Sequence, residues 1–268
     1  MSLKYYKPTT PGQRHKVRVD YKKDNIWRGT PLKRLTYNLR KQQGRNKGLI
    51  SSFHRGGGAK RTFRYIDFTR KILDTKGTVL RIEYDPNRSV YAALVVFETG
   101  ALCYMLATEG IGAFDTISST RFGKVSIRNG NSMPLKDIPI GTKVHNIEIF
   151  PLGGGSLSRA AGTFAKIIKK ENSKVTLRVK SKREIIVSDS CLATIGISAK
   201  IDHKNIVGGM AGYSRHLGQR PVVRGVAMNP VDHPHGGGEG KTSGGRLSVT
   251  PWSIPTKGYK TKRKHLRK

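Results

Sequence analysis

The positive charge of this chain is distributed so unevenly that it limits where a core can form. Residues 1–60 contain 16 basic and 2 acidic residues, and residues 201–268 contain 13 and 3. The middle is closer to balance, because residues 61–150 contain 12 basic and 9 acidic residues. Like charges repel one another in a compact body. We therefore expect a core in the middle of the chain, with extended basic arms at both ends that become ordered on a partner.

The total charge also limits the function. A net charge of +34 on 268 residues implies a polyanionic partner and argues against an ordinary metabolic enzyme. The length favours two modest domains. Apolar residues make up 36% of the chain, and 31 glycines add to them, so the composition permits a core.

β-rich and apolar segments separated by turn sequences predict two sets of strands. The first set comprises residues 78–84, 90–97 and 101–107, separated by turn sequences, a spacing typical of a small antiparallel barrel. The second comprises residues 144–149, 164–169, 175–180 and 184–187, in which Val175, Leu177 and Val179 are expected to face one way. Residues 192–200 are predicted to hold a turn or two of helix.

Several function classes lack their sequence features. Two cysteines, Cys103 and Cys191, are too few for a disulfide framework or a four-thiolate zinc site. The longest apolar run, residues 90–97, is far shorter than the roughly 18–20 residues that span a bilayer. The N-terminus has no apolar signal core. We expect no membrane partner, and no homo-oligomer.

Residues 235–242 nearly match a phosphate-binding loop of nucleotide hydrolases. His235 stands where that motif requires its first glycine, although Lys241 and Thr242 fit its end. The motif also needs a strand before it and a helix after it, and neither flank has that pattern. A nucleotide hydrolase that uses residues 236–242 is therefore a weak alternative.

Two histidines in the same region raise the question of a metal or catalytic site. His233 and His235 lie near Asp232 and Glu239, but Pro234 and the following glycines predict a loop, and no third ligand has a diagnostic spacing. Acid–base chemistry at His233 lacks a partner nucleophile. We favour imidazoles that hydrogen-bond or stack on a polyanion.

Glycine clusters recur beside basic residues, at residues 55–61, 153–159 and 236–241. Consecutive glycines let the main chain lie against a ligand, and their N–H groups hold phosphate oxygens. Neighbouring arginines make bidentate phosphate contacts. One cluster would be an ordinary flexible loop, whereas three beside basic residues favour a phosphate-rich partner.

Structured RNA fits these features better than duplex DNA, because no helix-turn-helix, zinc-finger or leucine-zipper pattern is present. Aromatic residues in basic, turn-rich surroundings are candidates for base stacking: Tyr5, Tyr6, Phe53, Tyr213, Trp252 and Tyr259. Tyr84, Tyr91 and Phe97 are expected in the core instead. The predicted RNA-binding residues are Arg55, Gly56, Gly57, Lys60, Arg61, Arg64, Arg88, Arg159, Arg215, Arg220, Arg224, His233, His235, Lys241, Arg246 and Lys257.

One long segment resembles a known family. Residues 224–240, RGVAMNPVDHPHGGGEG, closely resemble the signature of large-ribosomal-subunit protein two. Shorter matches follow the family's order along nearly the whole chain: TPG at 10–12, HRGGG at 54–58, EYDPNRS at 83–89, VHNIE at 144–148 and VTPW at 249–252.

The resemblance implies a mainly β fold. Its expected parts are a basic N-terminal arm (1–59), an oligonucleotide-binding-type (OB-like) β-barrel (60–125), an SH3-like β-barrel (126–200) and an extended basic C-terminal arm (201–268). The implied partners are large-subunit rRNA, neighbouring ribosomal proteins and the small subunit at the interface. No cofactor is expected beyond Mg²⁺ ions held by the rRNA.

The resemblance also implies roles in subunit association and in the peptidyl transferase centre, whose chemistry belongs to RNA. Asp232 and His233 are expected to position an RNA-facing loop there, not to catalyse. A free-standing RNA chaperone is the main alternative.

Departures from the usual bacterial pattern point to an organelle. Gly153 and Ser156 replace a common lysine and glutamine, Met210 and His216 replace a common lysine and tryptophan, and the sequence stops at Lys268 without the basic tail of many members. They favour a mitochondrial ribosome, with a plastid or bacterial ribosome as alternatives.

Overall fold

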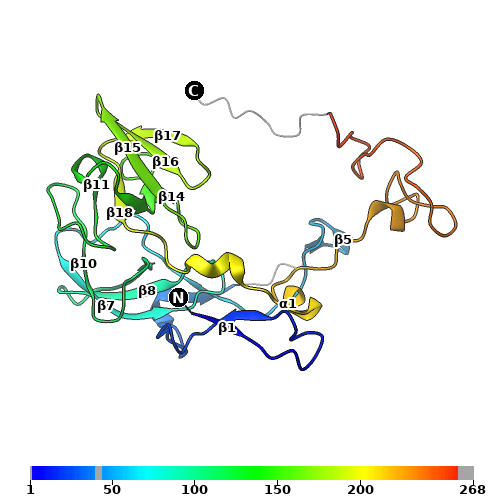
Figure 1. The fold of residues 1–268 in the computed structure, drawn as a ribbon, viewed down its shortest axis with the longest axis horizontal. Coiled ribbons are helices and arrows are strands. Elements are labelled where there is room, and N and C mark those ends of the chain that lie inside the picture. Colours follow the sequence, from blue (N-terminus) through cyan, green and yellow to red (C-terminus); the bar gives the residue numbers. More distant parts are fainter. Residues whose placement is uncertain (1, 40–43, 259–268) are drawn as a thin grey trace. The chain divides into compact units, whose positions relative to one another are not determined.

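The fold is built almost entirely from β-strands and turns. A computed structural model describes residues 2–39 and 44–258 (Figure 1). Within them, the one α-helix is α1 (Ala211–His216). The same residues include four short 3-10 helices: η1 (Lys33–Leu35), η2 (Leu135–Asp137), η3 (Ile201–Asn205) and η4 (Gly225–Ala227). The mainly β prediction is confirmed.

The first sheet is antiparallel and has the strand order β10-β7-β8-β9. Its strands are β7 (Lys76–Glu83), β8 (Ala92–Phe97), β9 (Leu102–Leu106) and β10 (Thr116–Ser118). Val79 pairs with Val95, and both are fully buried. The three strands expected from residues 78–107 are therefore present, with ends that differ by one or two residues. Phe97 and Tyr91 lie in the core as expected, whereas Tyr84 is 41% exposed and that expectation is wrong.

The second sheet contains six antiparallel strands in the order β11-β18-β12-β15-β16-β17. Val175 and Leu177 are fully buried and Arg178 is exposed, as the predicted alternation requires. Thr176 is also buried, however, and Val179 is only half-buried, so the alternation is present only in part. The bounds are β11 (Ser132–Pro134), β12 (Lys143–His145), β15 (Ala165–Glu171), β16 (Lys174–Val179), β17 (Glu184–Ser188) and β18 (Leu192–Ile195).

The helix predicted within residues 192–200 is wrong. Leu192–Ile195 forms strand β18, which pairs with β11 and with β12. All four residues are buried. A strand covered on both faces shows a continuous apolar run instead of alternation, and a short run of that kind is not distinguishable from helix by periodicity.

The strand predicted over residues 144–149 is interrupted. Asn146 adopts a left-handed conformation with φ of 48°, which ends β12 and begins β13 (Ile147–Glu148). β13 then pairs with β14 (Gly155–Leu157) outside the six-stranded sheet. A Cβ atom at Gly155 would lie 2.1 Å from Oδ1 of Asn146, so any larger residue here would displace the Asn146 side chain.

Part of the basic N-terminal segment contributes to the core, which sequence reasoning did not anticipate. Ile26 is 7% exposed and packs with the first sheet's apolar residues. The backbone N–H of Leu32 donates to the Tyr104 hydroxyl at 2.9 Å. Further short pairs are β1 (Leu3–Tyr5) with β2 (Val17–Val19), and β3 (Thr36–Asn38) with β6 (Thr62–Arg64).

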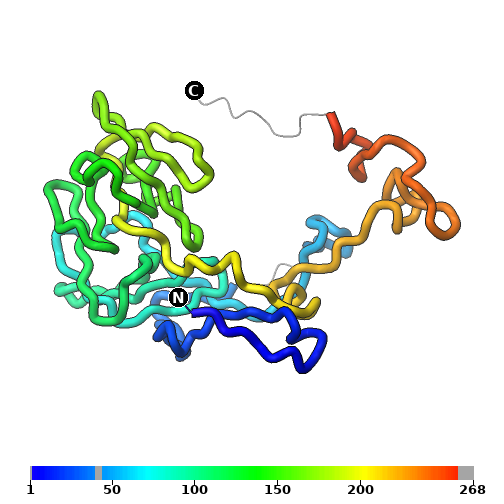
Figure 2. The backbone as a smooth tube through the Cα atoms, in the orientation of Figure 1, coloured from blue at the N-terminus to red at the C-terminus, as the bar shows by residue number. Residues whose placement is uncertain are grey.

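The chain divides into two units, which we describe separately. The first comprises Met1–Lys41 and Gly58–Leu217 and contains both large sheets. The second comprises Gln42–Gly57 and Gly218–Lys268. In the second unit, β4 (Arg45–Asn46) pairs with β5 (Leu49–Ile50), and Arg55 bridges to Gln219. Figure 2 traces the backbone in colours that follow the residue number. Phe53 and Trp252 make an edge contact at 6.1 Å between ring centres.

Candidate nucleic-acid interface

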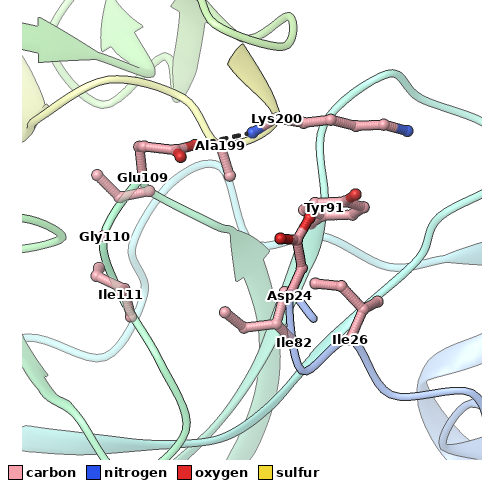
Figure 3. A pocket seen from close by; sticks show the side chains of 10 residues that line it. Asp24, Ile26, Ile82, Tyr91, Glu109, Gly110, Ile111, Ala199 and Lys200 are labelled. Atoms are coloured by element: carbon pink, nitrogen blue, oxygen red, sulfur yellow. Dashed lines mark hydrogen bonds between the residues drawn. The ribbon is translucent and has the colours of Figure 1, made fainter. Parts of the chain in front are cut away.

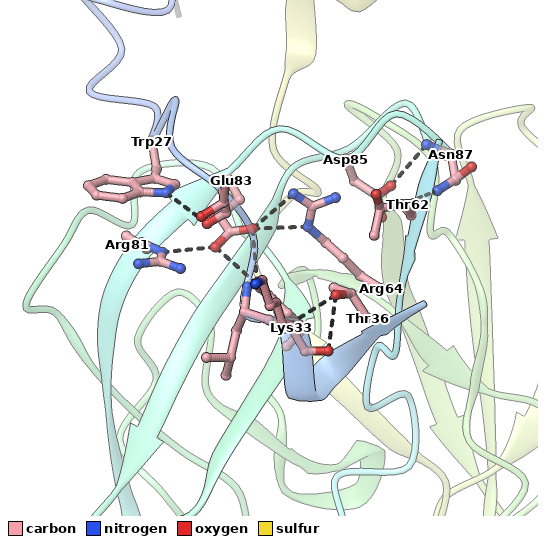
Figure 4. Close-up of polar contacts among 12 residues, drawn as sticks. Trp27, Lys33, Thr36, Thr62, Arg64, Arg81, Glu83, Asp85 and Asn87 are labelled. Atoms are coloured by element: carbon pink, nitrogen blue, oxygen red, sulfur yellow. Dashed lines mark hydrogen bonds and ion pairs between the residues drawn. The ribbon is translucent and has the colours of Figure 1, made fainter. Parts of the chain in front are cut away.

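Glu83 is a buried carboxylate that holds two arginines and a tyrosine (Figure 4). Its oxygens lie 2.9 Å from an Arg64 nitrogen and 2.8 Å from the Arg81 Nε, and the Tyr104 hydroxyl donates to them at 3.0 Å. The Arg64 side chain is only 7% exposed. The structure thus gives Arg64 an internal partner, which leaves it the least accessible of the predicted RNA-binding arginines.

Two more buried carboxylates neutralise arginines in the same unit. Asp85 is fully buried and lies 2.6 Å from the Arg88 Nε. Glu148 lies 2.8 Å from Arg121 and also accepts the backbone N–H of Leu192 at 3.0 Å. Because these carboxylates form ion pairs with arginines inside the fold, they do not neutralise the basic side chains on the outer surface.

The second glycine cluster lies against the first sheet's connections. The Gly155 N–H donates to the Phe68 carbonyl at 2.8 Å, and the Gly154 N–H donates to Glu148 at 3.3 Å. The guanidinium of Arg159 lies 4.7 Å from the Phe68 ring centre while the residue stays exposed. Backbone amides of this cluster therefore have protein partners, and Arg159 is its solvent-facing cation.

The first glycine cluster is fixed by the chain around residues 216–220. The Gly56 N–H donates to the Gly218 carbonyl at 3.0 Å, and the Ala59 N–H donates to the His216 carbonyl at 2.9 Å. Gly57 and Gly58 have φ of 62° and 88°, which glycine adopts without strain. Arg55 and Lys60, on either side of these glycines, are exposed.

The loop around His233 and His235 is organised by its own imidazoles. His233 is 8% exposed, and its Nδ1 accepts the His235 backbone N–H at 3.0 Å. The His235 Nε2 accepts the Val249 N–H at 3.0 Å, so its Nδ1 donates to the Gly244 carbonyl at 2.9 Å. This pattern assigns a neutral His235 ring. The two rings stack at 5.1 Å, so both histidines have structural roles within the loop.

Glycines permit the tight packing of that loop. A Cβ at Gly225 would lie 2.5 Å from the His233 ring, and one at Gly236 would lie 2.4 Å from the Asn229 carbonyl. The Thr242 hydroxyl donates to the Gly237 carbonyl at 3.1 Å. Around residues 235–242, neither the strand nor the helix of a nucleotide-hydrolase loop is found among the described residues.

The structure sorts the predicted residues by exposure. Gly56, Arg64 and His233 are buried, and Arg61, Arg88 and His235 are half-buried. The exposed ones are Arg55, Gly57, Lys60, Arg159, Arg215, Arg220, Arg224, Asp232, Lys241, Arg246 and Lys257. Of the candidate stacking residues, Tyr5, Phe53 and Trp252 are 73%, 53% and 68% exposed, while Tyr259 lies outside the described residues.

Sequence reasoning missed a buried polar connection between the two sheets. Arg70 is 4% exposed, contacts the Met105 sulfur and donates to the Thr194 hydroxyl at 3.1 Å. His145 is fully buried and lies 3.2 Å from the Thr108 hydroxyl. Burial, and secondarily the Arg70 charge, lowers the His145 pKa to about 3. Nothing in the local sequence marks these residues, because their partners are far away along the chain.

Lys200 was also missed. It is 5% exposed, and its Nζ lies 5.3 Å and 5.0 Å from the ring centres of Tyr84 and Tyr91. Burial lowers its pKa to about 8. A cavity of about 210 Å³ adjoins it, where its backbone N–H donates to Glu109 at 3.0 Å (Figure 3).

Neither a metal-binding cluster nor a membrane-spanning helix occurs among the described residues. No group of three or more histidine, cysteine, aspartate or glutamate side chains there is placed to hold a metal ion. Among the same residues, no helix has the length and apolar character needed to cross a membrane.

Comparison with known proteins adds two family models and several relatives. Residues 32–119 match "Ribosomal Proteins L2, RNA binding N-terminal domain", and residues 128–253 match "Ribosomal Proteins L2, C-terminal domain". A relative from Roseobacter denitrificans is 49% identical over 265 residues, which cover 98% of this chain and 93% of the relative. One from Brucella ovis is 48% identical over 263 residues, covering 98% and 94%. Both relatives are named "Large ribosomal subunit protein uL2".

Proposed function

The chain belongs to the family of large ribosomal subunit protein uL2, and from this membership we propose that it binds large-subunit rRNA as a structural constituent of that subunit. Its proposed work is to support subunit association and the assembly of the peptidyl transferase centre. Its proposed neighbours are other ribosomal proteins and the small subunit at the interface.

One observation carries the proposal. The carboxylates of Glu83, Asp85 and Glu148 are each no more than 2% exposed and pair with arginines inside the fold. The exposed cations of the glycine-flanked loops therefore lack acidic compensation from these groups. Phosphate is the ligand that such cations neutralise in large number, and rRNA presents it densely.

The proposed division of labour follows the two sheets. We assign the four-stranded sheet to an OB-like barrel over residues 60–125 and the six-stranded sheet to an SH3-like barrel over residues 126–200. The model matches at 32–119 and 128–253 support two successive domains. The basic arms, 1–59 and 201–268, make the deepest RNA contacts in this proposal.

Asp232 and His233 are proposed to position the loop that faces the peptidyl transferase centre. Burial of the His233 ring under Gly225 supports a positioning role, because a buried imidazole without a partner nucleophile is poorly placed for catalysis. Asp232 is exposed on the same turn. The protein is not an enzyme in this proposal, and the chemistry of the centre belongs to RNA.

The test is subunit association of the protein in its own cells. Sucrose-gradient fractionation at low Mg²⁺ should place it with large subunits through moderate-salt washes, and crosslinking followed by RNA sequencing should give one rRNA region. Similar crosslinking to unrelated RNAs would favour a free-standing RNA chaperone. Recovery of the protein chiefly outside the large subunit would contradict the proposal.

The proposed compartment is the mitochondrial ribosome, with plastid and bacterial ribosomes as the alternatives. Gly153, Ser156, Met210 and His216, which depart from the usual bacterial pattern, support an organellar copy. The relatives from Roseobacter denitrificans and Brucella ovis are bacterial proteins. Immunodetection in purified mitochondria, compared with the cytosolic fraction, tests this assignment.

A further inference from the structure

We propose that a hollow between the N-terminal segment and the first sheet binds one unstacked nucleotide of the rRNA. Trp27 and Tyr84 take the base, and Arg18, Arg28 and Lys60 take its phosphates. This inference rests on the proposed function and names a contact within it that the glycine-flanked motifs do not include.

The hollow is a cavity of about 520 Å³ within the first unit. It is formed by residues between 18 and 31, residues between 60 and 64, and residues 84 and 86. Pockets for small ligands span about 300–1,000 Å³, so a single nucleotide fits this size class. Four of the lining residues are arginine or lysine, and none is acidic.

The basic side chains that line the hollow differ in whether an acidic residue of the protein neutralises them. Arg64 is neutralised by Glu83 (Figure 4). In the described part of the chain, none of the ion pairs includes Arg18, Arg28 or Lys60. The Nε of Arg18 is buried without a hydrogen-bond partner among these residues, and its guanidinium lies 4.7 Å from the Tyr213 ring centre. A buried N–H donor that lacks a hydrogen-bond partner is costly, and an anion in the hollow that accepts from it offsets that cost.

The aromatic rings are held in place before any ligand arrives. The Trp27 Nε1 donates to the Thr30 carbonyl at 3.4 Å, and the Arg81 guanidinium lies 4.6 Å from the ring centre. A Cβ at Gly29 would lie 2.6 Å from the indole, so glycine lets the backbone pack against it. Trp27 is nevertheless 45% exposed. A fixed, exposed aromatic ring is a platform on which a base stacks with little loss of side-chain entropy.

An RNA strand is a better source of this nucleotide than a free mononucleotide. The lining offers aromatic rings and cations, and its neutral hydroxyls are limited to the side chains of Thr62, Tyr21 and Tyr84. Weak, general contacts of this kind bind a free nucleotide poorly. They become effective when the nucleotide is tethered at high local concentration by contacts elsewhere.

The chain allows a direct optical test, because Trp27 and Trp252 are its only tryptophans. In the full-length Trp252→Phe variant, tryptophan emission reports on the hollow alone. The probes are a large-subunit rRNA transcript and a mixture of AMP, CMP, GMP and UMP. We expect the transcript to quench Trp27 at concentrations that also saturate filter binding, and the mononucleotides to quench it only at far higher concentrations.

Variants test the two halves of the site. Arg18→Gln with Arg28→Gln should lower the slope of log affinity against log salt by about 1.5, since each lost phosphate contact removes roughly 0.7–0.9. Tyr84→Leu should weaken transcript binding about five-fold or more, because one base stack is lost. The charge-matched control is Lys166→Gln with Lys174→Gln, at exposed positions of the second sheet, and it should change the slope less.

The outcomes separate this inference from the function on which it rests. Normal filter binding with unchanged Trp27 emission overturns the nucleotide site and leaves the proposed function standing. Loss of filter binding in the parent protein overturns both. Tight quenching by mononucleotides with none by the transcript overturns the rRNA as the source. If Tyr84→Leu fails to fold, ultraviolet crosslinking of the wild-type complex decides, because nucleotides must then attach to peptides that contain Trp27 or Tyr84.

Discussion

The buried Glu83 carboxylate both neutralises arginines and accepts a hydrogen bond that fixes the fold. It compensates Arg64 and Arg81, and it accepts the Tyr104 hydroxyl, which in turn accepts the Leu32 amide. The N-terminal segment is thus tied to the first sheet by a chain of polar contacts. Networks of this kind are stable only when every member is satisfied.

Replacing Glu83 with glutamine removes the charge and keeps the shape of the side chain. Because the Arg64 side chain is 7% exposed, its cation is left buried without a counter-charge, and we expect a loss of about 3–5 kcal/mol in the free energy of unfolding. Urea denaturation of the full chain measures it. The control is Glu184→Gln, whose pair with Arg178 is about half exposed and should contribute less than about 1 kcal/mol. Equal effects would refute the network.

The lowered pKa of the buried His145 predicts that the folded protein loses stability in acid. The pKa of His145 is lowered from 6.5 to about 3 in the folded protein. Between these two pH values, the imidazole is protonated in the unfolded chain but neutral in the folded chain. Stability therefore falls as pH decreases from 6.5 towards 3, by up to about 1.4 kcal/mol per pH unit. His145→Gln should flatten this slope in urea titrations between pH 6 and pH 4, whereas His15→Gln, at an exposed position, should not. A parallel slope in His145→Gln would contradict the assignment.

At the scale of elements, apolar runs between clear turn sequences were predictable as strands, including the almost fully buried β8, whereas the run at residues 192–195 was not. Residues 175–180 alternate in sequence, which reveals strand β16, although Thr176 is buried together with Val175 and Leu177. Leu192–Ile195 is buried throughout in the sheet interior, and its strand was mistaken for helix. Asn146 breaks the strand of residues 144–149 through a positive φ that no apolar pattern records.

The candidate site divides in the same way. Arg55 and Arg224 are predicted as RNA-binding residues from the glycines beside them, a pattern that is local in sequence, and the structure leaves both exposed. Arg64 is among the predicted RNA-binding residues, but the local sequence does not reveal its partner, Glu83, which lies nineteen residues away. The hollow at Trp27 was missed because three separate segments build it.

Ile26 tests whether the N-terminal segment is part of the first sheet's core. It is 7% exposed among that core's apolar residues, so Ile26→Ala should lower the free energy of unfolding by about 2–4 kcal/mol. Ile186→Ala, at a position 65% exposed on β17, should change it by less than about 1 kcal/mol. Thermal and urea melts measure both, and a negligible effect at Ile26 would mean that the segment folds independently of the sheet.

The loop after residue 224 depends on His235 as a brace. Because its two ring nitrogens bond Val249 and Gly244, His235→Ala leaves both backbone groups without those partners. We expect amide exchange at Val249 to accelerate about ten-fold, since a hydrogen bond contributes about 1 kcal/mol or more. Hydrogen-exchange mass spectrometry of the loop measures this, with the exposed His216→Ala as the control. Unchanged exchange at Val249 would rule out the brace.

For the whole molecule, the surplus of positive charge should govern binding. Removing Arg55, Arg220 and Arg224 as glutamines eliminates three exposed cations of the second unit, so the salt slope of rRNA affinity should fall by about 2–3. The melting temperature of the free protein should change little, because none of the three is buried. Filter binding from low to moderate salt gives the slope, and a slope equal to wild type would show that these side chains do not touch phosphate.

The acids that pair inside the fold have a consequence for the cell. A copy of the protein made in excess of its rRNA has a positively charged surface that its own acidic residues do not neutralise. Such a surface would bind messenger or transfer RNA non-specifically. To avoid such binding, the cell must match synthesis of the protein to transcription of the rRNA, or degrade the unassembled copies promptly.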